Sequence, residues 1–520
     1  MSKGLKGVHI PSNLLKNNNF LPQVKIGRSK FNLSEGHKTA FNGDLLIPIH
    51  WDELNPGDTF DVKIKGLLRL ATPVVPVMDN IKVKYFSFFV PNRLLWEHWQ
   101  NFMGERPTPS DTTDYQVPQI STETGIEFST IGDYLGIPPK IANLKASALP
   151  FRAYNLIWNE WFRDENLQEP VPVVLTDAEE KMSSYKLLKK NKTSDYFTSC
   201  LPWAQKGDPV MVPLVGSAPV MVDSESGPST FVATSARLYD GRDYQGFART
   251  SNEKNGSAEA TLYADMSKVA SSSINDLRKA FQVQKLLERD ARGGTRYVEV
   301  IQSHWGVTCP DYRLQRPEYL GGGSDYVNVT PIAQTSATDS TSPQGNLSAV
   351  GVAGTDGNGY VYSATEHGIV MTLACVSADI NYQQGLHRKW SKLNRFDYMF
   401  PSFWHLGEQA VLNKEIYATG TSTDNEVFGY QQRYRELREG VSKISSLFRS
   451  TAPQPLDFWH LAEKFENLPK LNSDFIVSNT PFDRVVAVQD EPIIIADFYF
   501  KIKAERPLPT YVEPGLIDHF

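Results

Sequence analysis

The residues whose types and spacing could support chemistry are few and scattered. His405 and Glu408 lie three residues apart in a stretch, 404–414, that we expect to be helical, and this spacing can serve a metal ion. No matching pair accompanies them, so a hydrogen bond at the surface or in the core is the competing interpretation. The glycines at 321–323 lack the lysine and the helix start of a phosphate-binding loop, which predicts a tight turn instead. Whether the protein holds a metal stays open.

Motifs of the common enzyme classes are missing from the sequence. It contains no nucleophile elbow, Walker loop, dinucleotide fingerprint or His-Glu-x-x-His element. Cys200, Cys309 and Cys375 lie far apart, so they form neither a disulfide framework nor a metal knuckle, and Cys309 is expected to be a buried thiol. We therefore expect no catalytic residues and no cofactor, and a reducing compartment.

Carboxylates and aromatic residues leave one enzymatic alternative open. The 10 Trp and 22 Tyr could line a sugar groove, although most are expected to fill cores and subunit contacts. A glycosidase pair is defined by the separation of two carboxylates in space, which a sequence does not give. A cytoplasmic β-rich carbohydrate-active enzyme or lectin is thus the alternative function.

The strongest binding signal is a basic arm at the N-terminus. Residues 1–34 contain six cations and no acid, and the cations are Lys3, Lys6, Lys16, Lys25, Arg28 and Lys30. Such an arm could lie along the phosphates of a nucleic acid with salt-sensitive affinity that does not depend on sequence. A solvated tail, or an arm on a neighbouring subunit, is the competing interpretation. Because the whole chain has a net charge of −6, any contact with nucleic acid must be local.

The elements that must position these residues are mainly strands, and they cluster near the two ends of the chain. Residues 59–70 and 492–503 alternate apolar and polar side chains, as strands with one wet face do. Residues 83–90 and 369–376 form more continuous apolar runs, which predict strands covered on both faces. A strand at 45–49, a type II turn at 55–58 and the strand at 59–70 predict a hairpin, and residues 484–488 predict a further strand. Distant strands of this kind most economically share one sandwich or barrel.

Between the two clusters, helices and loops are expected as insertions. Residues 94–102 and 154–162 have apolar side chains at helical spacing. Ser273 as N-cap and the glycines at 293 and 294 bound the clearest helix. Residues 206–266 and 335–359 are rich in small residues and predict long loops.

The last residues, 505–520, contain Pro507, Pro509 and Pro514 and should form an extended arm. Its apolar side chains should be buried against a neighbouring subunit, or against its own subunit. These candidate subunit-contact residues are Leu508, Tyr511, Leu516, Ile517 and Phe520.

Bulk composition bounds the class of protein. Hydrophobic residues make up 40% and charged residues 22% of 520 residues, which is typical of a globular protein. The first residues lack the apolar run of a signal peptide, and no stretch approaches 18 consecutive apolar residues. We expect a soluble protein made in the cytoplasm.

Short motifs along almost the whole chain resemble the major capsid proteins of gokushoviruses, small single-stranded DNA bacteriophages of the Microviridae. The motifs are GHKT (36–39), PGDTF (56–60), LATP (70–73), PVMDN (76–80), FVPNRL (89–94), WQNFMG (99–104), LPW (201–203), QKG (205–207), QKLLERDARGGTRY (284–297), RPEYLGG (316–322), YQQG (382–385), LGEQAVLN (406–413), LFRST (447–451) and PGLIDHF (514–520). The sequence departs from the family chiefly at 206–266 and 335–359, where the family itself varies.

The resemblance implies a mainly β fold, an eight-stranded viral jelly roll with long helical and loop insertions. It implies self-assembly into a small T=1 icosahedral capsid around circular single-stranded DNA, in the virion, after assembly in the cytoplasm of a bacterial host. The partners it implies are a small basic DNA-packaging protein, a minor pilot protein and a host surface receptor. No membrane insertion is expected.

One loop is expected to contact the host. Residues 206–266 are long and rich in turn formers, and loops held by a rigid scaffold are where binding residues tend to lie. The resemblance implies that three copies meet at a three-fold axis, so Tyr239, Tyr244 and Phe247 are candidate attachment residues. A spacer or an interfacial loop is the competing interpretation.

The expected domain organisation is therefore a basic arm (1–40), one jelly-roll domain (41–504) and the C-terminal arm (505–520). Within the domain, residues 91–367 are expected to be mixed helix and loop, including the protruding loop at 206–266. Uniform isometric particles under the electron microscope would separate a shell protein from a lectin or enzyme.

Overall fold

The computed structural model describes residues 27–208, 210, 220–222, 231–237, 243–249, 262–264, 274–335 and 347–511. The chain divides into two compact units, one formed by Gln205–Gly293 and the other by the rest of the chain. Within the described ranges, no helix is both long and apolar enough to cross a membrane.

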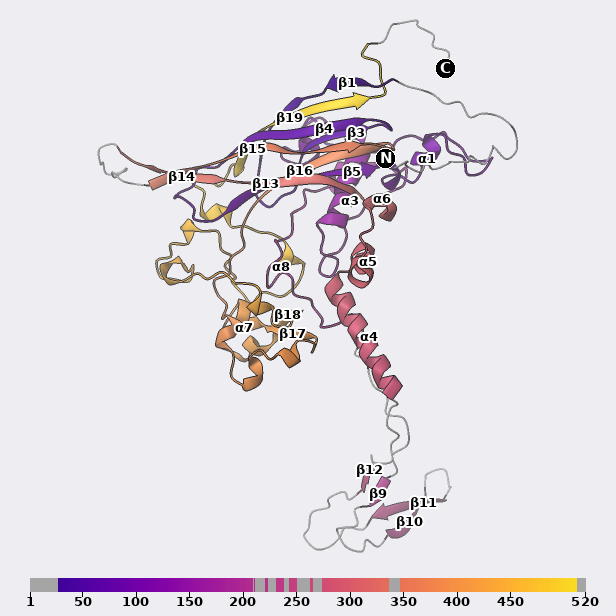
Figure 1. Cartoon of the computed structure of the whole chain (residues 1–520), viewed down its shortest axis with the longest axis vertical. Coiled ribbons are helices and arrows are strands. Elements are labelled where there is room, and N and C mark those ends of the chain that lie inside the picture. The colour runs from indigo at the N-terminus through magenta and orange to yellow at the C-terminus, as the bar shows by residue number, and fades with distance from the viewer. Residues whose placement is uncertain are drawn as a thin grey trace, which may run out of the picture. The chain divides into compact units, whose positions relative to one another are not determined.

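Two large antiparallel sheets form the centre of the larger unit (Figure 1). The terminal sheet has the order β1-β19-β4-β15-β14, and β2 also pairs with β19. Its strands are β1 (Ser29–Asn32), β2 (Glu35–Phe41), β4 (Thr59–Leu70), β14 (Asn328–Ala333), β15 (Leu347–Ser363) and β19 (Ile494–Arg506). The covered sheet has the order β13-β5-β16-β3. Its strands are β3 (Ile47–Leu54), β5 (Ile81–Pro91), β13 (Glu318–Tyr326) and β16 (Gly368–Ala378).

Shorter elements surround these sheets. The small strands are β6 (Gln119–Ser121), β7 (Lys145–Ser147), β8 (Glu180–Lys181), β17 (Glu408–Leu412) and β18 (Val427–Gln432). The helices are α1 (Trp99–Phe102), α2 (Ile131–Tyr134), α3 (Leu149–Trp161), α5 (Tyr297–Trp305), α6 (Asp311–Leu314), α7 (Asn413–Ile416) and α8 (Ser473–Ile476). Strands β6, β7 and β8 form one small sheet, and β17 pairs with β18.

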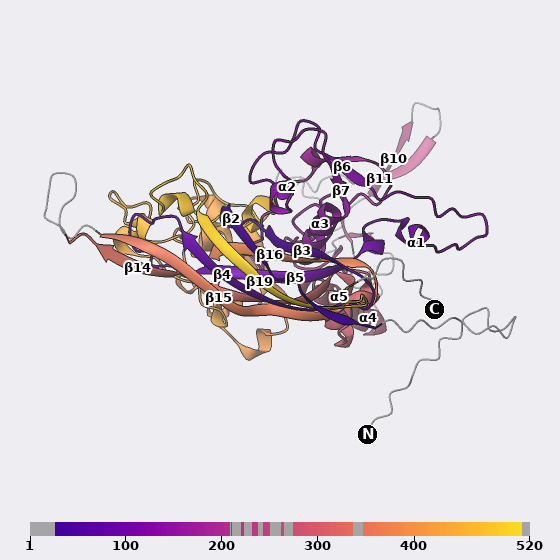
Figure 2. The ribbon, with the colours of Figure 1, turned by 90° about the horizontal axis from the view of Figure 1, so that it is seen from above.

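One hydrophobic core lies between the two sheets. It joins alternate residues of β4 and β19 to residues of β3, β5 and β16. The Phe500 ring stacks on His50 with ring centroids 4.8 Å apart, and Phe498 meets the edge of Tyr85. The strands nearest the two ends of the described chain therefore lie in one sheet, because β1 and β2 both pair with β19; Figure 2 shows β2 beside β19.

A second core covers the other face of the covered sheet. It joins Phe88 of β5 and Met371 of β16 to α3, whose Tyr154 and Ile157 are buried. Consequently β16 is buried along nearly its whole length, whereas β19 alternates buried and exposed residues. Both patterns confirm the strands that the sequence predicted at 369–376 and 492–503.

The predicted hairpin between 45–49 and 59–70 is wrong. The turn itself forms, since Gly57 has φ +91° and the Asp58 amide donates to the Asn55 carbonyl at 3.0 Å. However, β3 pairs with β16 while β4 pairs with β15 and β19. The turn therefore leads the chain from one sheet to the other, and long-range pairing overrides the local contact.

Two other predicted elements differ from the structure. The stretch 404–414, predicted as a helix, contains β17 and the start of α7, and Gly407 with φ +85° precedes the strand. Its Gln409 and Val411 are buried while their neighbours are not, which is the period of a strand. The strand predicted at 484–488 is also wrong, because that region holds a 3-10 turn and a single bridge from Val486 to Pro73.

The glycines at 321–323 lie within β13 and form no tight turn. A Cβ atom on Gly322 would collide with the carbonyl oxygen of Tyr85 on β5, so a glycine lets the two strands approach. Strands β13, β14 and β15 all come from the region 91–367 that was expected to be helix and loop. The glycine-rich residues 347–359 in particular form part of β15, which pairs with β4.

The smaller unit contains two strand pairs and one long helix. Strand β9 (Val220–Val222) pairs with β12 (Leu262–Ala264), and β10 (Phe231–Arg237) pairs with β11 (Asp243–Arg249). The helix α4 (Ile274–Gly293) confirms the clearest helix of the sequence, although Ser273 lies outside the described residues.

Candidate functional site

Two cations of the predicted basic arm lie in the described part of the chain. Arg28 donates hydrogen bonds to the carbonyl oxygen of Gly57 and, at 2.7 Å, to the hydroxyl of Thr59. Lys30 on β1 forms an ion pair with Glu505 on β19, with Nζ and Oε1 3.0 Å apart. The other four predicted cations, Lys3, Lys6, Lys16 and Lys25, lie outside the described residues.

Strand β1, which belongs to the predicted basic arm, lies next to an exposed basic surface of the terminal sheet. We call Lys63 of β4 and Lys501 and Lys503 of β19 the lysine face, because all three are exposed on the side opposite the core. Lys501 lies directly opposite Lys63, and Lys503 lies opposite Asn32 on one side and Asp61 on the other. None of the three has an ion-pair partner among the described residues.

Other lysines on the same side are paired. Lys38 reaches Asp497 at 3.0 Å, and Lys65 reaches Asp356 at 3.1 Å. Like charges that lie directly opposite each other on neighbouring strands destabilise a sheet, by roughly 0.2–1 kcal/mol. The juxtaposition of Lys63 and Lys501 is therefore unfavourable in the isolated chain, and a bound anion would relieve it. The neighbouring Tyr499 is half exposed and offers a ring for stacking.

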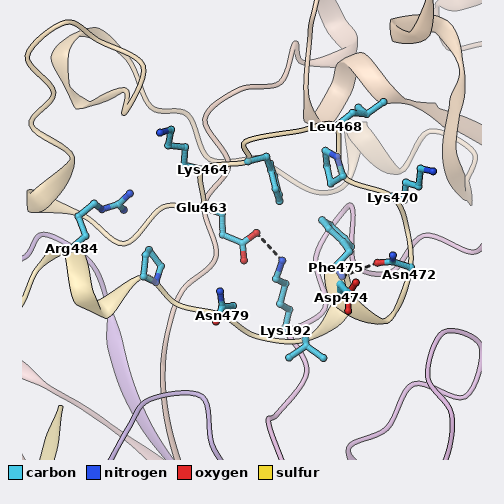
Figure 3. A pocket seen from close by; sticks show the side chains of 14 residues that line it. Lys192, Glu463, Lys464, Leu468, Lys470, Asn472, Asp474, Phe475, Asn479 and Arg484 are labelled. Atoms are coloured by element: carbon cyan, nitrogen blue, oxygen red, sulfur yellow. Dashed lines mark hydrogen bonds and ion pairs between the residues drawn. The ribbon is translucent and has the colours of Figure 1, made fainter. Parts of the chain in front are cut away.

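A separate pocket of about 510 Å³ lies among residues 463–484 and Lys192 (Figure 3). In it the Lys192 ammonium faces the Glu463 carboxylate at 2.7 Å, and both side chains are largely buried. The ammonium also lies 4.4 Å from the centre of the Phe475 ring. Burial raises the pKa of Glu463 despite the cation beside it.

The chemistry of this pocket is that of a structural ion pair. Its single buried carboxylate is held by Lys192, and no Ser, Cys or His is among the residues that line it. A nucleophile with an adjacent base is therefore missing from the pocket. Lys464, Lys470 and Arg484 also line it, so its charge suits an anion better than a cation.

The structure does not support the predicted metal site at His405 and Glu408, because that prediction required both residues to lie on one helix. Glu408 begins β17 and His405 precedes it in a loop, so the two side chains do not share a helix face. No cluster of His, Cys, Asp or Glu suited to a metal ion occurs in the ranges that the structure covers. Cys200 and Cys375 are buried free thiols, whereas Cys309, expected to be buried, is partly exposed.

The predicted subunit-contact and attachment residues are only partly covered. Leu508 and Tyr511 follow β19 and are exposed, while Leu516, Ile517 and Phe520 lie outside the described residues. Tyr244 and Phe247 belong to β11, where they lie opposite Ala236 and Ala233. Tyr239 lies outside the described residues.

Sequence reasoning missed one surface entirely. Residues 386–406 expose aromatic and aliphatic side chains, including Trp390, Phe396 and Trp404. No element was predicted for residues 386–403, and the helix predicted at 404–414 covered only the end of this stretch. The density of aromatic residues without either regular period was the signal that could have revealed it.

The chain is similar to known capsid proteins over almost its whole length. A family model described as "Capsid protein (F protein)" matches residues 20–516. The capsid protein VP1 of Bdellovibrio phage phiMH2K is 46% identical over 521 residues, which cover 96% of this chain and 97% of that protein. The capsid protein VP1 of Chlamydia phage 1 is 42% identical over 591 residues, covering 98% and 99%. That of Spiroplasma virus 4 is 37% identical over 533 residues, covering 94% and 96%.

Similarity to capsid proteins over almost the whole chain shows that this mainly β chain is a structural protein of a virus particle. The chain belongs to the F-protein family of phage capsid proteins. The resemblance to gokushovirus major capsid proteins is confirmed, and the alternative of a carbohydrate-active enzyme or lectin is not.

Proposed function

We propose that copies of this chain assemble into a T=1 icosahedral shell that encloses circular single-stranded DNA, and that the two packed sheets are its jelly roll. The observation that carries the proposal is the pair of four-strand paths β3-β16-β5-β13 and β19-β4-β15-β14, which share one core although their strands are remote in sequence. Strands β1 and β2 are additions at the β19 edge. Assembly takes place in the cytoplasm of the bacterial host.

Electron microscopy of the purified protein tests the shell. Uniform isometric particles are expected when the chain is expressed alone or with the small basic packaging protein and the minor pilot protein that we propose as partners. A preparation that stays monomeric under every condition, with its partners present, would contradict self-assembly.

The arm and the lysine face are proposed to contact the packaged DNA together. The described end of the arm, at β1, lies beside Lys503, so cations continue from one to the other. Replacing Lys3, Lys6 and Lys16 by Gln should lower DNA retention in a salt-dependent way, because each lost phosphate contact weakens binding and reduces its dependence on salt. Unchanged retention at every ionic strength would remove the arm from this role.

The stretch 206–266, which includes β10 and β11, is proposed as the protrusion that binds a host surface receptor near a three-fold axis. Its separation as part of a distinct compact unit supports this proposal. Replacing the stretch by a short Gly-Ser linker should leave shells that assemble but adsorb poorly to host cells. Shells that fail to form would make the stretch an assembly element instead.

The C-terminal arm is proposed to bind a neighbouring subunit. Arg506 holds the end of β19 between Asp52 and Asp58, at 3.7 and 3.5 Å, and the chain beyond it presents Leu508 and Tyr511 to solvent. Deleting the last twelve residues should leave soluble protein that closes few shells. Normal particle yield would count against the arm.

A further inference from the structure

The segment 386–406, which we call the aromatic segment, exposes more apolar surface than a solvated loop requires. Its large exposed side chains are Leu386, Trp390, Leu393, Phe396, Tyr398, Met399, Trp404 and Leu406. Four of these eight side chains are aromatic, and each such side chain can bury about 150–250 Å². Since all eight are 40–87% exposed, together with the smaller aliphatic ones they offer on the order of 800 Å². That is the area which one partner contributes to a standard protein interface.

The segment is held in place by polar contacts, so its apolar side chains stay outside. The Asp397 carboxylate accepts hydrogen bonds from the amides of Asn394 and Leu393 at 2.6 and 2.8 Å. These bonds lower the pKa of Asp397. At the start of the segment, Arg388 donates to the Ala410 carbonyl at 2.7 Å and pairs with the buried Glu415 at 3.1 Å. The surface is therefore preorganised for a partner.

Three short 3-10 turns display the aromatic rings at regular intervals. They span Arg388–Trp390, Arg395–Asp397 and Pro401–Phe403. Phe403 packs on both Phe396 and Phe400 with ring centroids 6.0 and 5.9 Å apart. Clustered Trp, Tyr, Phe, Met and Arg are the composition of interface centres, where few residues supply most of the affinity.

We propose that the aromatic segment is a contact surface for a second copy of this chain. The proposal rests on the proposed shell, in which every subunit must bury surface against its neighbours. Charge supports a second copy as the occupant, because the segment has four cations and one carboxylate in a chain whose net charge is −6. The rest of the chain is acidic in balance and would attract it.

Single-stranded DNA is the other occupant that cations and rings could suit. The aliphatic side chains Leu386, Leu393, Met399 and Leu406 favour protein, since bases stack on aromatic faces and gain little from exposed aliphatic groups beside a charged backbone. Two of the cations also already lie over rings of the segment, Lys392 over Tyr398 at 5.1 Å and Arg395 over Phe400 at 5.4 Å.

The first test replaces Trp390, Phe396 and Trp404 by Ser in the full chain. Because truncating each interface hot spot weakens association by about tenfold or more, particle yield should fall to the background while circular dichroism and the thermal midpoint stay those of the parent. The matched control replaces Leu67, Val361 and Ile495 by Thr, three equally exposed apolar residues of the terminal sheet. Its particle yield should stay close to that of the parent. Normal yield from the first variant, or equal loss in both, would overturn the proposal.

The second test identifies the occupant without relying on a folded triple variant. A photo-crosslinking phenylalanine analogue at Trp390 is irradiated in assembled, DNA-filled particles. A product of twice the chain mass that survives nuclease is expected. A nuclease-sensitive adduct, or no crosslink between chains, would overturn the second copy as the occupant. The particle yield of the parent chain is measured alongside. If the parent forms particles but no crosslink between chains appears, the contact surface is wrong; if the parent forms none, the proposed shell itself has failed.

Discussion

The two large sheets of the larger unit are both antiparallel, but one is covered on both faces and the other on only one. The covered sheet has apolar layers on both faces, so β16 contains a nearly unbroken run of buried residues. The terminal sheet has a core on one face and exposed, mostly charged or polar side chains on the other, so β19 alternates buried and exposed residues. One sheet thus supplies stability, whereas the other also presents a surface on which residues are free to serve binding.

The largest expected effect comes from placing a charge in each sheet. Leu373→Asp on β16 would bury a carboxylate without a partner in the second core, at a cost on the order of 3–5 kcal/mol. Ile495→Asp on β19 should change stability by only about 0.5 kcal/mol, since its side chain is exposed and lies opposite Arg69. Urea denaturation midpoints and soluble yields measure the contrast. Similar losses in the two variants would mean that the outer face is covered in the isolated chain.

The next comparison uses two neighbours on a single strand. Phe500→Ala removes a fully buried ring that stacks on His50, and should cost about 3–5 kcal/mol. Tyr499→Ala removes a half-exposed ring from the other face and should cost less than about 1 kcal/mol. Chemical denaturation of both variants gives the two values. A smaller loss for Phe500 than for Tyr499 would show that the assignment of faces is inverted.

This contrast is also the part of the fold that the sequence predicts best. Period-two alternation and continuous apolar runs record how many faces of a strand are covered, and they identified β4, β5, β16 and β19. The partners of those strands are not recorded locally, which is why the turn at 55–58 suggested a hairpin. Gly322 and the glycines of β15 were assigned to turns and loops because close approach of a neighbouring strand leaves no trace in the local sequence.

The candidate surfaces were predictable only in part. The basic arm was visible because six cations follow one another without an acid. The lysine face was not recognised, since it joins Lys63 to Lys501 across a pairing that spans most of the chain. The aromatic segment was missed because exposed and buried apolar residues look alike when no period separates them.

The buried ion pair between Lys192 and Glu463 in the pocket provides a third comparison, between buried charges and the exposed charges of the terminal sheet. Lys192→Met would leave the Glu463 carboxylate buried without its cation, at a cost of about 3–5 kcal/mol near pH 8. Because burial raises the pKa of Glu463 above its unfolded value, the folded state takes up the proton first, and the penalty should shrink as the pH falls through the folded-state pKa.

Denaturation of the parent and the Lys192→Met variant from pH 8 down to about pH 5 measures this difference. The double variant Lys192→Met, Glu463→Leu should recover much of the loss, because an apolar pair can replace a buried ion pair. A penalty that is independent of pH would assign the effect to lost packing against Phe475 rather than to charge.

Substitutions at the lysine face should have the smallest effect on the stability of the fold and the largest effect on DNA retention in particles. Replacing Lys63 and Lys501 by Gln removes two like charges that lie opposite each other, so the fold should become more stable by about 0.2–1 kcal/mol. DNA retention in particles should fall, with a weaker dependence on salt, because two phosphate contacts are lost.

The control replaces Lys38 and Lys65 by Gln, which removes the same charge from cations already paired with Asp497 and Asp356. That control should retain more DNA than the lysine-face variant and gain no stability. Equal DNA loss in both would mean that net charge alone matters, and that the uncompensated pair on the terminal sheet is not a binding site.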